Sequence, residues 1–67
     1  MVSYNKLWKL LIDKNKTKRQ LSEEAGLSSS TMAKLKKGEN LTTDVLGRIC
    51  NALDCDFGDI MEYLKKE

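Results

Sequence analysis

The segment around Gly26 constrains the fold of this 67-residue chain more tightly than any other feature. Thr17 and Gln20 have the spacing of a capping box, in which each side chain satisfies a free backbone N–H of the other residue at the start of a helix. Gly26 stands where that helix would end, because glycine adopts the left-handed conformation of a helix terminus without steric cost. Ser28 then has the position of an N-cap for another helix. The sequence therefore predicts two short helices joined by a tight turn.

Helical periodicity extends through the rest of the chain, where apolar residues recur every three or four positions. Pairs of apolar residues flank three of the expected helix starts as hydrophobic staples, namely Leu27 with Met32, Leu41 with Leu46, and Cys55 with Ile60. The absence of proline and the presence of only 4 glycines favour helices over strands and hairpins. The expected helices cover residues 3–14, 17–25, 28–36, 42–53 and 56–64. The predicted fold class is therefore all-α, a compact five-helix bundle that forms one domain over residues 1–67.

The inward-facing positions of these helices predict the hydrophobic core. The core residues are expected to be Tyr4, Leu7, Leu11, Leu21, Ala25, Met32, Leu35, Leu46, Ile49, Leu53, Phe57 and Ile60. Cys50 and Cys55 are expected to be small packing residues with free thiols, because two cysteines cannot supply the four ligands of a structural zinc site. A disulfide between them, or a metal shared across a dimer, is the alternative for this pair.

Composition excludes several classes of function. The chain has no histidine, which is the commonest general base and the commonest metal ligand, so we expect no enzyme, no cofactor and no metal. No apolar run approaches the ~18 residues that span a bilayer, and residues 1–9 lack the apolar stretch of a signal peptide. The expected location is the cytoplasm. Trp8 lies among lysines, as in a membrane-surface helix, but a domain this small is expected to need its aromatic face for the core.

Charge is distributed unevenly along the chain. The formal net charge is only +2. Residues 1–38 nevertheless hold nine Lys or Arg against three Asp or Glu, a net charge of +6, whereas residues 39–67 hold three against seven, a net charge of −4. This asymmetry favours a polyanionic partner, although an ordinary solvated face would also account for it.

Two helices closed by a short glycine turn form a helix-turn-helix, in which the first helix crosses the DNA backbone and the second enters the major groove. The segment 17–31 closely resembles the helix-turn-helix of the lambda-repressor/Cro-type (XRE-type) transcriptional regulators, and the resemblance continues through residues 34–40, 46–56 and 58–60. The resemblance covers roughly residues 3–64, and the chain is similar to the small single-domain branch of that family. The resemblance implies sequence-specific binding to double-stranded DNA by a transcriptional regulator, a repressor by expectation, associated with the nucleoid.

The resemblance also assigns candidate contact residues. Ser28, Ser29, Ser30 and Lys34 match the start and outer face of the family's recognition helix, so they are the candidates for base contacts. The candidates for phosphate contacts are Lys16, Thr17, Lys18, Arg19, Thr31, Lys36, Lys37 and Asn40. Many relatives carry glutamine where this chain has Lys18, and many read bases with longer side chains than serine. Direct contacts from this chain are therefore expected to discriminate only weakly between base pairs.

One such domain covers only half of a binding site, so we expect a homodimer on a palindromic operator, with half-sites about 34 Å apart. The expected interface is the last helix and the segment before it, because Met61, Tyr63 and Leu64 exceed what one core needs. A protein-interaction module, such as an antitoxin-like or anti-repressor component, is the alternative function.

Overall fold

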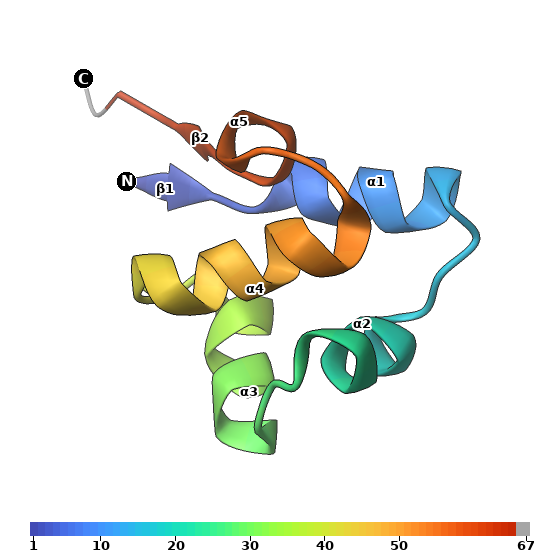
Figure 1. Ribbon diagram of the computed structural model, residues 1–67. Coiled ribbons are helices and arrows are strands. Elements are labelled where there is room, and N and C mark those ends of the chain that lie inside the picture. Colours follow the sequence, from blue (N-terminus) through green and yellow to red (C-terminus); the bar gives the residue numbers. More distant parts are fainter. Residues whose placement is uncertain (66–67) are drawn as a thin grey trace.

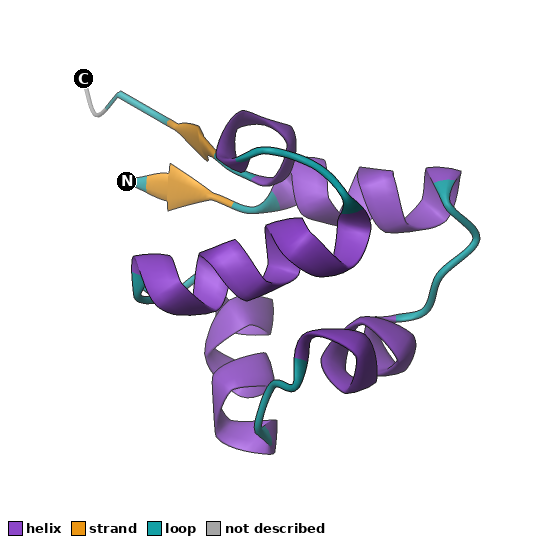
Figure 2. Cartoon of the chain, viewed as in Figure 1, coloured by secondary structure: helices purple, strands orange, loops and turns teal. Residues whose placement is uncertain are grey.

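The computed structural model describes residues 1–65 and consists mainly of helices (Figures 1 and 2). The helices are α1 (Asn5–Asp13), α2 (Lys18–Ala25), α3 (Ser29–Lys37), α4 (Thr43–Leu53) and α5 (Phe57–Ile60), and the strands are β1 (Val2–Ser3) and β2 (Glu62–Tyr63). In Figure 1, α4 runs across the middle of the molecule, with α5 and the two strands on one side and α2 and α3 on the other. The all-α prediction is confirmed, with a minor two-stranded sheet added. Within the described residues, no helix has the length and apolar content needed to cross a membrane.

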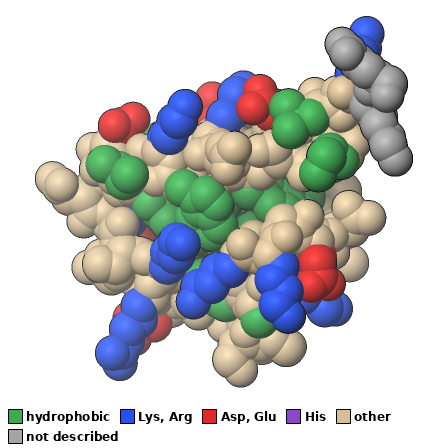
Figure 3. Space-filling view, turned by 180° about the vertical axis from the view of Figure 1, so that it is seen from behind, with side chains coloured by type: hydrophobic (Ala, Val, Ile, Leu, Met, Phe, Trp, Pro, Cys, Tyr) green, Lys and Arg blue, Asp and Glu red, His purple; other side chains and the backbone are tan. Residues whose placement is uncertain are grey.

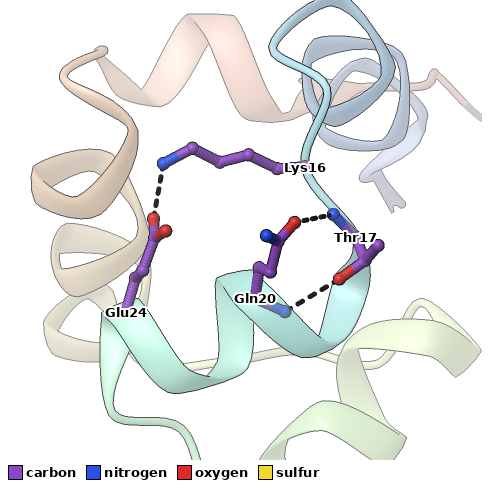
Figure 4. A network of polar contacts seen from close by, with 4 residues as sticks. All are labelled: Lys16, Thr17, Gln20 and Glu24. Carbon is purple, nitrogen blue, oxygen red and sulfur yellow. Dashed lines mark hydrogen bonds and ion pairs between the residues drawn. The ribbon is translucent and has the colours of Figure 1, made fainter.

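Local sequence determines where α2 and α3 begin. The Gln20 backbone N–H donates to Thr17 Oγ1 at 3.0 Å, and the Thr17 N–H donates to Gln20 Oε1 at 2.8 Å, so the predicted capping box is present (Figure 4). The hydroxyl of Ser28 accepts from the Thr31 N–H at 3.2 Å and caps α3. Gly26 closes α2 in the left-handed region, at φ 66°. The two helices and the turn predicted around Gly26 are therefore confirmed.

The left-handed backbone at Gly26 gives a direct test of the turn. We expect Gly26→Ala to lower the free energy of unfolding by about 1 kcal/mol, since a side chain in the left-handed region is strained. A Cβ at this position would meet no atom within 4 Å, so steric crowding adds nothing to that cost. Urea denaturation followed by circular dichroism measures the change.

Gly47 supplies the matched control for this substitution. It lies inside α4, and a Cβ there also meets no atom within 4 Å. Because glycine is a poor residue in a helix interior, Gly47→Ala should raise the free energy of unfolding by about 0.5–1 kcal/mol. Equal shifts of the same sign in the two variants would contradict the role given to the Gly26 turn.

The core gathers buried side chains from all five helices. Helix α1 packs on α5, α2 packs on α4, and α4 also packs on α5. Eleven of the twelve predicted core residues are buried, and the exception is Phe57, which is 39% exposed. Leu27 and Cys50 are also buried. They stand outside the predicted core list, but the sequence predicted Leu27 as part of a hydrophobic staple and Cys50 as a small packing residue. Leu27 closes the turn after Gly26, and its burial helps to fix α3 against α2.

The two ends of the chain differ from the prediction. Ser3 lies in β1, so α1 begins two residues later than expected, and α5 ends at Ile60 instead of continuing to Leu64. Met61 has an extended backbone, and β2 pairs antiparallel with β1. The Leu64 N–H donates to the Met1 carbonyl at 2.7 Å, and the Met1 ammonium donates to the Leu64 carbonyl at 3.0 Å.

These corrections have a common physical reason. Pairing between the two ends of a chain is a long-range interaction, which the periodicity of either segment alone does not reveal. Because α5 ends at Ile60, Leu64 lies outside the helix, and Phe57 at the start of α5 has no later helical turn to pack beside. Phe57 and Leu64 remain 39% and 41% exposed, and Tyr63 is 70% exposed. The predicted core position of Phe57 was therefore wrong.

The thiols of Cys50 and Cys55 meet at the end of α4. Asp54 has a left-handed backbone, and the Cys55 N–H donates to the Cys50 carbonyl at 3.0 Å, which brings the two residues together across the helix end. Both cysteines are free, as predicted. Burial, reinforced by the neighbouring Cys50 thiol, raises the pKa of Cys55 from 9.0 to about 11.

A raised pKa predicts slow alkylation of Cys55. In the wild-type chain at pH 8, we expect iodoacetamide to react with Cys55 at least about tenfold more slowly than with the same chain unfolded in urea, because little Cys55 thiolate is present. Peptide mapping distinguishes the modified Cys55 from Cys50. The rate should keep rising with pH beyond pH 9, and mass spectrometry measures it. A rate that levels off near pH 9 would contradict the raised pKa.

Candidate nucleic-acid interface

The turn between α2 and α3 is held rigidly in place. The Ser22 hydroxyl donates to the Leu27 carbonyl at 3.1 Å, and the Leu27 N–H donates back to the Ser22 carbonyl at 2.9 Å. Buried side chains anchor both helices beneath the turn, and they are Leu21, Ala25, Leu27, Met32 and Leu35. The outward faces of α2 and α3 are therefore fixed relative to each other.

All four predicted base-contact residues are exposed: Ser29, Ser30 and Lys34 lie within α3, and Ser28 is its N-cap. Among residues 1–65, neither Ser29 nor Lys34 has a side-chain hydrogen bond or ion-pair partner. Their donors are therefore free to meet a ligand. A hydroxyl donates and accepts, whereas the Lys34 ammonium only donates, so the two residues suit different atoms on a base edge.

Ser28 is placed differently from its neighbours. Its Oγ accepts from the Thr31 N–H, donates to Thr31 Oγ1 at 2.9 Å and lies 3.1 Å from Ser30 Oγ. A hydroxyl has one donor and two acceptor positions, so these contacts occupy most of its capacity. In this structure Ser28 shapes the start of α3, and a contact to a base would have to replace one of its present partners.

The start of α2 is rich in positive charge. Lys18 and Arg19 are exposed in its first turn, which contains no acidic residue. The free N–H groups and the dipole of a helix N-terminus also favour anions. Lys16, just before the helix, forms an ion pair with Glu24, with Nζ 2.5 Å from Oε1 (Figure 4). Within residues 1–65, Lys16 is therefore the one candidate phosphate contact at this end with a carboxylate partner.

A further group of candidates lies at the other end of α3. Lys36, Lys37 and Asn40 are all exposed, and Gly38 closes the helix in the left-handed region, at φ 75°. Lysines are favourable in the last turn, where the helix dipole is negative. Figure 3 shows several Lys and Arg side chains around an apolar area on one face of the molecule, with Asp and Glu side chains also on that face. The end of α3 thus adds the exposed positive charges of Lys36 and Lys37 to those of Lys18 and Arg19 at the start of α2.

Tyr4 fixes the loop that carries Asn40. Its hydroxyl donates to the Glu39 carbonyl at 3.0 Å, across 35 positions of sequence. The ring is buried, and burial raises the pKa of the Tyr4 hydroxyl above its usual value, so the donor proton is kept. Sequence reasoning placed Tyr4 in the core and missed this contact, because no local pattern connects the two residues.

Comparison with known proteins decides what this arrangement is. Residues 6–66 match the Cro/C1-type HTH DNA-binding domain family. The chain belongs to this family. It is therefore a DNA-binding domain of the transcriptional-regulator kind and not an enzyme. The helix-turn-helix at α2 and α3 predicted from sequence is the family's defining unit, so this prediction is confirmed.

Two relatives agree with the assignment. The chain is 58% identical to a transcriptional regulator of known crystal structure, VanUg, with a TM-score of 0.93 over 97% of this chain and 87% of that one. It is 38% identical over 50 residues to an uncharacterized HTH-type transcriptional regulator, YozG, of Bacillus subtilis (strain 168). That alignment covers 72% of this chain and 60% of YozG, so the chain spans less than two thirds of that relative.

Proposed function

We propose that the protein represses transcription by binding a specific double-stranded DNA sequence, with α3 in the major groove and α2 across the backbone. The observation that carries the proposal is the rigid pair of α2 and α3 with Ser29, Ser30 and Lys34 exposed on its outer face. The helix-turn-helix domain that we expect over residues 1–67 supplies this surface, and the binding site on chromosomal DNA places the protein at the nucleoid.

Base contacts in this proposal come from the exposed side of α3. Lys34 donates to O6 or N7 of a guanine, and Ser29 and Ser30 pair with whichever donor or acceptor a base presents. Ser28 reaches a base by exchanging its contact with Ser30 for one to DNA. Since serines are short and accept several partners, Lys34 is expected to contribute most of the direct sequence preference.

Phosphate contacts come from the two ends of the helix pair. At the start of α2 the proposed residues are Lys16, Thr17, Lys18 and Arg19, and around α3 they are Thr31, Lys36, Lys37 and Asn40. Lys16 contacts a phosphate while its charge is shared with Glu24, so its contribution is expected to be the smallest of the basic residues. These contacts fix the position of α3 in the groove and carry little sequence information.

Selection of bound duplexes from a random DNA pool tests the proposal. We expect the enriched sequences to contain an inverted repeat with half-sites about one helical turn apart. Fluorescence anisotropy with a labelled duplex then gives the dissociation constant at two salt concentrations. The absence of binding to any sequence at low salt would overturn the proposed function.

A homodimer forms part of the proposal. In Figure 1, α5 and β2 lie on the side of α4 away from α2 and α3. Phe57 in α5, Tyr63 in β2 and Leu64 after it are exposed apolar residues of this end of the chain. This surface is the proposed interface, in place of the long final helix expected from sequence. Sedimentation of the wild type and of Tyr63→Lys, with and without the selected duplex, measures the oligomeric state.

The same exposed surface supports a second candidate function, a protein-interaction module such as an antitoxin-like or anti-repressor component. In that case a different protein covers Phe57, Tyr63 and Leu64. A protein that stays monomeric, binds no duplex and forms a stable complex with another protein would favour this candidate.

A further inference from the structure

The ammonium group of Lys18 lies over the ring of Trp8, which is the only tryptophan in the sequence. Lys18 Nζ lies 4.4 Å from the centroid of the Trp8 ring, within the distance at which a cation is attracted to an aromatic face. Trp8 belongs to α1 and is half-buried against the core, whereas Lys18 is the exposed first residue of α2. The contact therefore joins a well-anchored ring to a flexible side chain on the candidate DNA-binding surface.

Lys18 occupies a position that is unfavourable for a lysine in the unbound protein. The dipole of α2 is positive at its N-terminus, Arg19 adds a second positive charge, and the first turn contains no acidic residue. Among the described residues, Lys18 has no carboxylate partner. The Trp8 ring is thus the one favourable contact that the structure gives to this ammonium group.

The surroundings leave the other side of that ammonium group open. An open hollow of about 380 Å³ lies between α1 and the start of α2 and is lined by Trp8, Leu11, Ile12, Lys16, Thr17 and Lys18. An ammonium group has three N–H donors, and the ring can face only part of it. A phosphate can therefore bind Lys18 while Lys18 stays on the ring. The other lysine of this hollow, Lys16, is paired with Glu24.

We propose that Trp8 is a positioning residue that holds Lys18 ready for a DNA phosphate at the start of α2. This inference rests on the DNA-binding function proposed above. A free lysine side chain samples many rotamers, and ordering it costs free energy when a phosphate binds. Trp8 orders the Lys18 side chain in the unbound protein. The conformational entropy of this side chain is therefore lost when the protein folds and not when DNA binds.

A double-mutant cycle on the selected duplex tests the proposal by fluorescence anisotropy. We expect Trp8→Leu, which keeps an apolar side chain but removes the aromatic face, to weaken binding about 2- to 5-fold. Trp8→Phe should weaken binding less. In a Lys18→Met background, Trp8→Leu should have no further effect, since there is no cation to position. Ile12→Ala is the matched control: it lines the same hollow, is 73% exposed, and should bind as the wild type does.

The cycle separates positioning from a loss of structure. Binding by Trp8→Leu that equals or exceeds wild-type binding would overturn the proposal, and so would an equal loss with and without Lys18. A measurement without DNA adds a second test. The ring current of Trp8 should move the NMR signals of the Lys18 side-chain methylene protons upfield in the wild type and not in Trp8→Leu. Absence of this shift overturns the inference even if DNA binding stands, whereas a shift without DNA binding shows that the proposed function has failed.

Discussion

Raising the salt concentration from 50 mM to 200 mM is expected to weaken binding of the selected duplex by about 10⁴- to 10⁶-fold. Each subunit presents basic residues at the start of α2 and at the end of α3, and we expect about four to six phosphate contacts per subunit, or about eight to twelve for the proposed dimer. Each neutralised phosphate releases condensed counterions. The logarithm of the affinity therefore falls linearly with the logarithm of the salt concentration, and the slope is proportional to the number of phosphate contacts. Anisotropy titrations at several salt concentrations give the slope of the logarithm of affinity against the logarithm of salt concentration.

Two lysines on α3 supply the control for that slope. Lys36→Ala should lower the magnitude of the slope by about 2 and weaken binding evenly across sequences, because it removes one phosphate contact from each subunit of the dimer. Lys34→Ala should instead relax the preference at particular base pairs by about 1–3 kcal/mol. Both residues are exposed on the same helix, so neither change should affect folding much. Identical behaviour of the two variants would contradict the division between base and phosphate contacts.

The parts of the interface that were predictable from sequence are those specified by neighbouring residues. The capping box of Thr17 and Gln20, the left-handed turn at Gly26 and the cap at Ser28 each depend on residues within a few positions of one another. The identities of the side chains at these positions are enough to determine the local backbone. The start of both helices, and therefore the exposed face of α3, follows from them.

The parts that were missed depend on contacts between distant segments. The Trp8 ring meets Lys18 across the bend between α1 and α2, Tyr4 reaches the Glu39 carbonyl, and Lys16 pairs with Glu24. Each of these side chains has several possible partners in the sequence, and only the packing of the helices selects one. The same reason explains the end of the chain, where pairing with β1 replaced the helical continuation after Ile60.

Helix α4 connects the core to the DNA-binding unit, because it packs on α2 and on α5. Ile49 lies in α4 with 0% of its surface exposed. We expect Ile49→Ala to lower the free energy of unfolding by about 2–5 kcal/mol, through lost apolar burial and the cavity left behind. A domain of this size has a total stability of about 3–10 kcal/mol. The variant should therefore unfold at a markedly lower temperature than the wild type, and thermal denaturation followed by circular dichroism measures the loss.

Two variants show whether burial is the cause. Ile49→Val removes one methylene group and should cost only about 0.5–1.5 kcal/mol. Ile12→Ala makes the same change as Ile49→Ala, also in a helix, but at a side chain that is 73% exposed, so it should change stability by no more than about 0.5 kcal/mol. Because α2 is supported by α4, the loss of DNA binding in Ile49→Ala should follow its unfolded fraction and recover on cooling. A variant that stays folded but no longer binds DNA would show that Ile49 acts on the recognition surface itself and not through the core.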